Sequence, residues 1–470
     1  MKSITAKPFG IRDKLGYLFG DFGNDFTFIL SSSFLLKFYT DVMHVSAGVV
    51  GIVMMLARFV DAFTDVTMGR IADKTPPTRA GKFKPWILRM CAPVAIASFL
   101  IYQSAFATAA MWFRILWLTV TYILWGSIFY TSINIPYGSM ASTISREPAD
   151  RQSLSTYRTM GSTLAGVVVG AGIPLVAYDT RIVGDTTVAV MNGARFTIIA
   201  GVFSALAVVA YLLCYYMTTE RVVPDTLPHR ESGGVRRLLG EAVRNRALIS
   251  IIGASVLMLL SQFTLQQMAN YVYPDYYGNA AGQSISSLVM MGGMILAAAL
   301  TKPMTNKFGK AEVSAFSCIL ATVVCIVTWL FKPANMWVFI ALQGLNWIGL
   351  GMFSMVCWAM ITDVIDYSEI KNGVREDGSV YALYSFARKL GQAVAAGLAG
   401  WLLEAIGYNN NAIAQGVGQT EAVKSGIFSI TTLVPALGFG LLAVVLLFWY
   451  PLHKKQVEEN NAILKAKREA

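Results

Sequence analysis

The chain has 470 residues, of which 55% are hydrophobic and 14% are charged, and its mean hydropathy is +0.54. Soluble domains carry roughly 25% charged residues. The composition therefore excludes an ordinary globular enzyme and predicts an all-α membrane protein.

Segments long enough to cross a membrane recur along almost the whole chain. Crossing the hydrocarbon core takes about 20 apolar residues in a helix. Twelve segments reach this length, and because the number is even, both termini are expected on one side of the membrane. The predicted spans are 17–39, 47–71, 86–105, 111–138, 153–177, 196–216, 248–273, 285–302, 312–331, 336–360, 379–406 and 426–450.

The net charge of +11 is an orientation signal rather than a nucleic-acid surface. Lys and Arg cluster in alternate connections, and the intervening connections hold few of them. By the positive-inside rule, the basic connections and both termini face the cytoplasm. We therefore expect a multi-pass protein of the plasma membrane, which in a bacterium is the cytoplasmic membrane. Its expected partner is the lipid bilayer, and we expect it to bind no nucleic acid.

The longest basic connection lies between six spans and six spans, as expected for a linker between two halves. A short basic pattern at 69–84, after the second span, returns at 302–310, after the eighth. This echo is typical of a duplicated six-helix unit with a binding site near the midplane between the halves. The predicted domains are an N-terminal half at 1–216, a cytoplasmic linker at 217–247, a C-terminal half at 248–450 and a cytoplasmic tail at 451–470.

The second span places three ionisable residues on one helical face, Arg58, Asp61 and Asp65. An ionised side chain at a helix centre costs about 2.5–3.5 kcal/mol on insertion scales, so this face must point into a helix bundle or a wet cavity. Arg58 can neutralise only one carboxylate. The pair is therefore a candidate cation or proton site, and the alternative is a clamp between Arg58 and an aspartate that only holds helices together.

Further polar residues point to a ligand site. Asp25, in the first span, could accept two sugar hydroxyls, or it could make a helix-packing hydrogen bond. Asn134 belongs to the polar end of the fourth span, which is interrupted by Pro136 and forms a candidate ligand wall. Arg158 and Lys389 also fall inside spans, and for Arg158 the alternative is snorkelling to the cytoplasmic surface.

A charged cluster precedes the eleventh predicted span. In one interpretation it is a solvated loop. In the other, its ion pairs close one conformation of the protein and break in the opposite one. The candidate gate or salt-bridge residues are Arg58, Asp363, Asp366, Glu369 and Arg375.

Signatures of soluble catalysis are missing from the sequence. No glycine-rich phosphate loop ends in Lys-Ser or Lys-Thr, and the three histidines are scattered. The five cysteines lie in apolar segments without paired spacing, which predicts packing residues rather than disulfides. We therefore expect neither enzyme activity nor a cofactor, and no metal site beyond one for sodium.

Several motifs resemble those of the glycoside–pentoside–hexuronide:cation symporters of the major facilitator superfamily. The resemblance extends over nearly the whole chain and implies twelve transmembrane helices in two six-helix halves that work by alternating access. It also implies that Asp61, Asp65 and Thr131 bind the coupling cation, Na⁺ or H⁺, and that Asp25, Arg158 and Lys389 line the sugar and cation cavity. The motifs are Asp61-x-x-x-Asp65 with Met68-Gly69, Gly81-Lys82-Phe83-Lys84-Pro85-Trp86, Asn134-Ile135-Pro136-Tyr137 and Asp363-x-x-Asp366-Tyr367.

The chain departs from the melibiose permease, a member of that family, at three positions. Asn134 and Gly138 stand where that protein has a second sugar-binding Asp and a stacking Trp, which argues against a galactoside. Thr64 replaces an Asn beside the second cation carboxylate, which leaves both sodium and proton coupling open. The motifs around Asn134 and Lys389 look more like the glucuronide and xyloside branches, so we expect a hexuronide or a pentoside as the substrate.

Two other classes of function compete with a cation symporter. A channel or passive sugar facilitator has no need for two carboxylates buried on one face, so Asp61 and Asp65 favour coupling. A membrane sensor without transport would usually carry a soluble output domain, and the tail after Tyr450 is too short for one.

Overall fold

The computed structural model describes residues 8–183, 186–222, 245–372, 377–412 and 417–469. The chain divides into two compact units. Unit 1 comprises Met1–Leu227, Gly278–Ser284 and Gly400–Gln419, and unit 2 comprises Pro228–Tyr277, Ile285–Ala399 and Thr420–Ala470. The linker predicted at 217–247 lies mostly outside the described residues.

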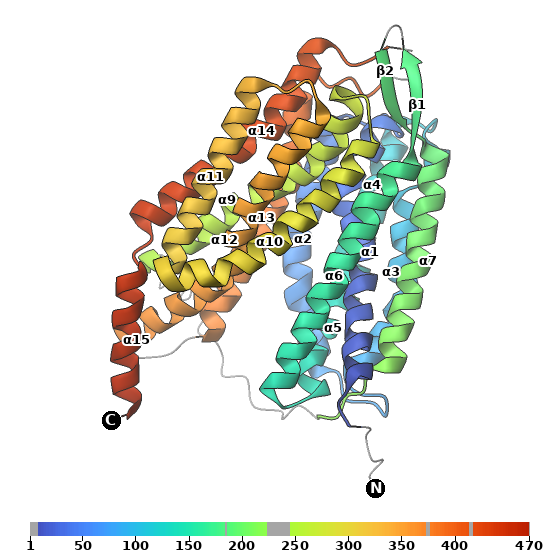
Figure 1. The fold of residues 1–470 in the computed structure, drawn as a ribbon. Helices are drawn as coiled ribbons and strands as arrows, with labels where there is room; N and C mark the ends of the chain where they lie inside the picture. The colour runs from blue at the N-terminus through green and yellow to red at the C-terminus, as the bar shows by residue number, and fades with distance from the viewer. Residues whose placement is uncertain (1–7, 184–185, 223–244, 373–376, 413–416, 470) are drawn as a thin grey trace. The chain divides into compact units, whose positions relative to one another are not determined.

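The N-terminal part of the chain is helical apart from one β-hairpin (Figure 1). The fourth predicted span is one continuous helical run in which a π-helical turn, η2, joins α4 to α5. The elements are α1 (Ile11–Asp41), α2 (Ala47–Lys74), α3 (Lys84–Ile101), η1 (Ser104–Phe106), α4 (Met111–Ile123), η2 (Leu124–Tyr130), α5 (Thr131–Ile144), α6 (Pro148–Ala177), β1 (Tyr178–Val183), β2 (Thr186–Met191) and α7 (Gly193–Met217).

The C-terminal part of the chain is helical wherever it has regular structure among the described residues. Two more π-helical turns, η3 and η4, end the helices that precede them. The elements are α9 (Arg246–Tyr271), η3 (Val272–Tyr276), α10 (Ala281–Phe308), α11 (Lys310–Phe331), α12 (Met336–Asn372), α13 (Asp377–Ala405), α14 (Glu421–Val444), η4 (Val445–Trp449) and α15 (Lys454–Glu469).

Among the described residues, 10 helical segments are long and apolar enough to cross a membrane. The predicted spans at 17–39 and 379–406 correspond to α1 and α13, which are not in that set. Both helices are long, but their ionisable residues lower the mean hydropathy of every 18-residue stretch within them. The all-α membrane class is confirmed, and the number of twelve spans stays a prediction.

Side-chain caps begin several of the helices. Ser46 accepts a hydrogen bond from the Val49 amide at the start of α2, and Asn192 caps α7 in the same way. Asn245 and Thr420 cap α9 and α14. These short polar side chains satisfy amide groups that have no partner inside the helix. The caps therefore fix where the spans begin.

Small residues let the helices of unit 1 approach closely, and α1 packs against both α6 and α7. A Cβ atom added to Gly161 of α6 would lie 2.4 Å from the carbonyl oxygen of Leu18 in α1. One added to Gly20 would lie 2.2 Å from the ring of Tyr137. Close approach through glycine is typical of helix contacts in membranes. These contacts bring the polar residues of α1 next to those of α5 and α6.

A β-hairpin, which the sequence did not predict, follows α6. Strands β1 and β2 pair antiparallel, with Tyr178 opposite Met191. Its base is held by Asp179, which accepts a hydrogen bond from Asn192 (2.8 Å) and forms an ion pair with Arg195 (2.8 Å). The Asn192 hydrogen bond and the Arg195 cation hold the pKa of Asp179 below its ordinary value. The hairpin thus joins α6 to α7 by a defined path.

Lys37, near the C-terminal end of α1, is fully buried and was not among the predicted intramembrane charges. Its ammonium group lies 2.8 Å from a carboxylate oxygen of Asp41 and 3.0 Å from the hydroxyl of Tyr408. The Tyr408 hydroxyl in turn donates to Asp41 at 2.8 Å. A buried charge requires such pairing. These bonds anchor the Gly400–Gln419 segment to unit 1.

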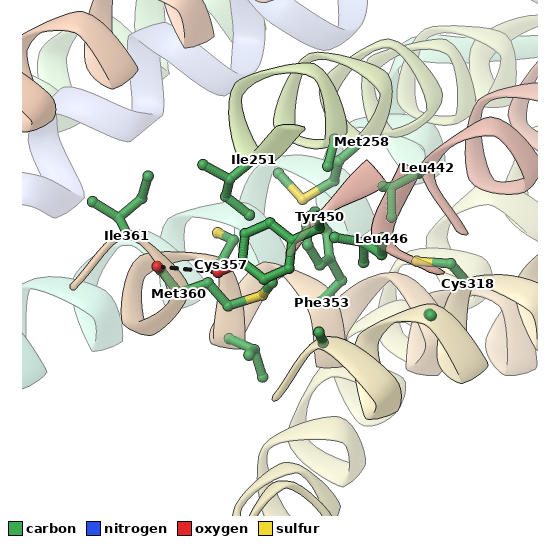
Figure 2. Packing of buried hydrophobic residues seen from close by; sticks show 14 of the residues in the cluster. Ile251, Met258, Cys318, Phe353, Cys357, Met360, Ile361, Leu442, Leu446 and Tyr450 are labelled. Atoms are coloured by element: carbon green, nitrogen blue, oxygen red, sulfur yellow. Dashed lines mark hydrogen bonds between the residues drawn. The ribbon is translucent and has the colours of Figure 1, made fainter. Parts of the chain in front are cut away.

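The core of unit 2 is an apolar cluster contributed by α9, α11, α12, α14 and η4 (Figure 2). Tyr450 lies among these side chains, and its hydroxyl donates to the Met360 carbonyl at 3.5 Å. Cys318 and Cys357 belong to the same cluster. All five cysteines of the chain are free and buried, as expected for packing residues.

Two segments are more helical than predicted. The charged residues from Asp363 to Glu369 were expected in a connection, but they lie in α12, which continues to Asn372. In the predicted tail, α15 runs over Lys454–Glu469 and contacts α11 and α12. Hydropathy marks where the apolar stretch ends, but helix formation depends on the backbone and can continue into polar sequence.

Gly161→Ala should destabilise the protein, because the added methyl group would enter the contact between α1 and α6. We expect a loss of about 1–3 kcal/mol in the free energy of unfolding. Gly172→Ala is the matched control in α6, because nothing lies within 4 Å of its Cβ position; it should gain up to about 1 kcal/mol. Thermal unfolding of the purified proteins tests this, and equal midpoints for the two variants would contradict the packing.

Candidate functional site

The three charged residues predicted on one face of the second span lie on α2. A guanidinium nitrogen of Arg58 lies 3.5 Å from the carboxylate oxygen Oδ2 of Asp61, and both side chains are more than four-fifths buried. The guanidinium group also lies over the ring of Phe28, 4.9 Å from its centre. Asp65 follows Asp61 by one helical turn and is half-buried. The ion pair of Arg58 on this face is with Asp61.

Hydroxyl groups from the α4–η2–α5 run bind both carboxylates. Ser127 donates a hydrogen bond to Oδ1 of Asp61. Thr131 donates to Oδ1 of Asp65 at 2.7 Å, and its hydroxyl also lies 3.1 Å from the Gly126 carbonyl. A π-helical turn shifts the phase of a helix and is frequent at functional sites. The structure therefore brings predicted cation residues Asp61, Asp65 and Thr131 into one contact region, and adds Ser127.

Thr64, between the two carboxylates in sequence, does not extend its hydroxyl toward this region. Its oxygen lies 3.1 Å from the Asp61 carbonyl and 3.3 Å from the Val60 carbonyl, both in its own helix. Hydroxyls commonly bond to backbone carbonyls within the same helix. The hydroxyl proton of Thr64 is thus occupied within α2.

Among the described residues, no three His, Cys, Asp or Glu side chains are grouped closely enough to hold a metal ion. A monovalent cation on α2 would therefore need neutral oxygen ligands as well as the two carboxylates. Hydroxyl and carbonyl oxygens are suitable ligands for a hard cation of this kind. The groups on η2 and α5 supply both types of oxygen.

The predicted substrate residues of unit 1 meet where α1, α5 and α6 pack. The Arg158 guanidinium forms an ion pair with Asp21 at 3.0 Å and lies over the ring of Tyr137, 5.5 Å from its centre. Asp21 is buried, with 6% of its surface exposed. Its carboxylate orients the guanidinium of Arg158, whose side chain keeps 42% of its surface exposed.

Asp25 and Asn134 lie on α1 and α5 of the same region. Asp25 is half-buried and accepts a hydrogen bond from Ser162 of α6. The Asn134 side-chain oxygen lies 3.5 Å from the Asn24 amide nitrogen, and the oxygen of Asn24 accepts from Tyr211 at 2.8 Å. These amides and hydroxyls are polar groups of the kind that bind sugar hydroxyls.

Gly138 leaves space beside Arg158. A Cβ atom at this position would lie 3.9 Å from a terminal guanidinium nitrogen of Arg158. An aromatic residue there would lie against the guanidinium group. Glycine at position 138, in place of an aromatic residue, therefore leaves the Arg158 guanidinium group less enclosed.

Lys389 lies on the part of α13 that belongs to unit 2, and its side chain is half-buried. The neighbouring Arg388 donates to the Tyr384 hydroxyl at 3.3 Å and lies over the ring of Trp358, 5.4 Å from its centre. Arg388 is therefore held by aromatic residues of unit 2. Lys389 thus belongs to unit 2, and the other predicted substrate residues belong to unit 1.

The predicted gate residue Asp363 forms an ion pair with Lys310. The Lys310 ammonium lies 2.7 Å from one of its carboxylate oxygens and 2.8 Å from the other. Both residues belong to unit 2, and the bond joins the start of α11 to α12. Asp366 and Glu369 lie further along α12, and Arg375 lies outside the described residues.

Comparison with known proteins yields a family match and similar transporters. Residues 16–454 match the family model described as MFS/sugar transport protein. The glucuronide carrier protein homolog of Escherichia coli (strain K12) is 30% identical, over 95% of this chain and 94% of its own length. The isoprimeverose transporter of Lactiplantibacillus pentosus is 30% identical, over 93% of this chain and 88% of its own. An inward-facing bacterial homolog of the lysosomal transporter Spinster has a TM-score of 0.64 at 12% identity, covering 96% of this chain and 97% of that one, and shares the fold.

Charge reversal at Asp363 should change the balance between inward- and outward-facing states, because it removes the bond between α11 and α12. We expect the same direction of effect at Arg375. The labelling rate of a cysteine placed by Gly138→Cys, with the native cysteines replaced, measures the balance. The double change Lys310→Asp with Asp363→Lys should restore the rate. Loss of thermal stability with unchanged labelling would show that the pair is only a brace.

Proposed function

This chain belongs to the MFS/sugar transport protein family, and we propose that it moves a sugar or glycoside across the membrane by symport with a cation. The family match and the similar transporters establish a membrane protein that carries a small-molecule sugar and is not an enzyme. They also bear out the resemblance to glycoside–pentoside–hexuronide:cation symporters. Coupling, the substrate and the roles of single residues are the proposed parts.

The observation that carries the coupling proposal is the pair of carboxylates on α2. Asp61 and Asp65 each accept a hydroxyl from the adjacent helical run, and the ion pair of Arg58 is with Asp61. Inserting charged residues into a membrane span costs free energy, so such residues usually have a function. Passive passage of a neutral sugar would not use two carboxylates on one face. Binding of a coupling cation would use both of them.

We assign the cation ligands to Asp61, Asp65 and Thr131, with Na⁺ or H⁺ as the coupling ion. Binding of the cation would remove one net negative charge from the α2 face. An empty site would then resist the conformational change more than an occupied one. Such a difference in charge between states supports coupling through alternating access.

The proposed sugar ligands are Asp25, Asn134, Arg158 and Lys389. Asp21 is a further residue of this set, because it fixes the guanidinium of Arg158. A carboxylate, an amide and a guanidinium together offer acceptors and donors for ring hydroxyls. The names of two relatives refer to a glucuronide and to isoprimeverose, which supports a hexuronide or a pentose-containing glycoside as the substrate.

The proposed architecture has two six-helix halves at 1–216 and 248–450, joined by the cytoplasmic linker 217–247. The two compact units support this division, although Gly278–Ser284 and Gly400–Gln419 cluster with the N-terminal part. The alternation of basic connections supports cytoplasmic termini. We place the protein in the cytoplasmic membrane of a bacterium, because the relatives above are bacterial.

Asp61→Asn and Asp65→Asn should abolish uptake driven by a cation gradient, because either change removes a charge from the cation site. Exchange of labelled for unlabelled sugar should persist, since the sugar residues stay intact. Proteoliposomes with an imposed Na⁺ or H⁺ gradient measure both activities. Concentrative uptake by both mutants would rule out their role in coupling.

Asn134→Asp should weaken an anionic substrate more than a neutral one. A unit charge about 4 Å away changes the interaction by roughly 4 kcal/mol at an effective dielectric of 20. In the wild type, a hexuronide or pentoside should compete better than melibiose for uptake. Competition assays on wild type and mutant test both points. If melibiose competes best, or if the mutation affects both kinds of sugar equally, the charge argument is wrong.

A further inference from the structure

Arg388 is a charged residue in the middle of α13 that belongs to neither the proposed sugar site nor the proposed cation site. At about 1.5 Å per residue, it lies about 16 Å along the helix from Asp377 and about 25 Å from Ala405. An arginine side chain does not reach either end of the helix over these distances, and lipid headgroups are equally out of its reach. Charged side chains at such a depth almost always face the interior of a bundle or a wet cavity. The positive charge of Arg388 therefore calls for a counter-charge in the protein or in its substrate.

The structure surrounds the Arg388 guanidinium group with aromatic side chains. One of its nitrogens donates to the Tyr384 hydroxyl at 3.3 Å. The group lies over the rings of Trp358 and Tyr384, 5.4 and 5.7 Å from their centres. Among the described residues, no carboxylate forms an ion pair with Arg388, whereas Arg58 and Arg158 each pair with an aspartate. Aromatic rings attract a cation but do not neutralise its charge.

Three helices of unit 2 fix the position of this guanidinium group. Tyr384 belongs to α13, and its hydroxyl shares a hydrogen bond of 2.7 Å with Ser255 of α9. Trp358 belongs to α12, and its ring meets that of Tyr384 edge to face, 5.1 Å between centres. Arg388 is half-buried and Trp358 keeps 43% of its surface exposed, so the group is not sealed in the core. An arginine has five N–H donors, and the bond to Tyr384 uses one of them.

We propose that Arg388 binds the anionic group of the substrate, and that the substrate is an acidic sugar such as a hexuronide rather than a neutral pentoside. The inference rests on the proposed sugar transport and specifies its substrate class. A carboxylate accepts two parallel N–H bonds from one guanidinium group and supplies the counter-charge. A neutral sugar hydroxyl would accept a hydrogen bond but would leave the charge of Arg388 uncompensated.

Arg388 differs in this respect from the two basic residues already placed in the sugar site. The charge of Arg158 is paired with Asp21 inside unit 1. Lys389 follows Arg388 directly, but neighbouring positions of a helix point in different directions. Sequence reasoning did not separate these two adjacent cations, because the aromatic surroundings of Arg388 come from α12 and from its own helix and become visible only in the fold.

The test compares matched pairs of sugars that differ in one group. The pairs are glucuronate with glucose, galacturonate with galactose, and the methyl β-glycosides of glucuronate and glucose; each acidic member carries a carboxylate where its neutral partner carries a hydroxymethyl group. Isothermal titration of the purified full-length protein measures each dissociation constant without an ion gradient. In at least one pair, the wild type should bind the acidic member about tenfold or more tightly than the neutral one, the size expected for a hydrogen bond between charged groups. Arg388→Gln should remove this preference and leave the affinity for the neutral member within about twofold.

Two further variants separate binding from folding. Arg388→Lys keeps the charge but loses the paired donors of the guanidinium group, so it should keep only part of the preference. Trp358→Leu removes a ring that supports Arg388 and should also reduce the preference. Trp337→Leu is the matched control, because this tryptophan lies near the start of the same helix with 55% of its surface exposed; it should change neither constant. If Arg388→Gln does not fold, as judged by thermal unfolding, Arg388→Lys and Trp358→Leu carry the comparison.

The outcomes separate this inference from the proposed function. Equal losses for the acidic and the neutral member in Arg388→Gln would show that the residue only supports the fold, and would overturn the inference. A wild type in which no acidic member binds more tightly than its neutral partner would also overturn it, while sugar transport would stand. A wild type that binds an acidic sugar through Arg388 but accumulates no sugar under a cation gradient would instead contradict the proposed symport.

Discussion

The cost of placing two carboxylates in a membrane span governs the rest of the structure. Neither Asp61 nor Asp65 could remain ionised against lipid, so α2 must turn this face toward other helices. The α4–η2–α5 run meets it with two hydroxyls, and Arg58 provides one counter-charge. The proposal of cation coupling rests on this pair of carboxylates.

A second set of buried charged residues in unit 1 consists of ion pairs. Arg158 is paired with Asp21, and Lys37 is paired with Asp41 and Tyr408. Their charges are balanced locally, so they hold helices and orient donors without requiring an ion. This contrast separates the α2 face from the other polar contacts of unit 1. It is also the reason to expect that the proposed sugar residues stay ordered when the proposed cation residues are changed.

The sequence was sufficient for the membrane class, the approximate spans and the face that carries Asp61 and Asp65, because hydropathy and helical spacing determine these directly. It did not reveal Ser127, because the π-helical turn depends on backbone packing against α2. Hydropathy also could not predict the hairpin after α6 or the helical extension of α12, because neither element depends on burial in lipid.

The central claim is that a sugar accumulates because a cation moves with it. The most direct measurement is uptake of labelled hexuronides, pentosides and other glycosides by proteoliposomes containing the wild-type protein, with and without an imposed cation gradient. The account predicts that at least one of these sugars rises above its external concentration under the gradient and falls back when an ionophore collapses it. Equilibration to the external concentration, at the same rate with or without a gradient, would contradict it.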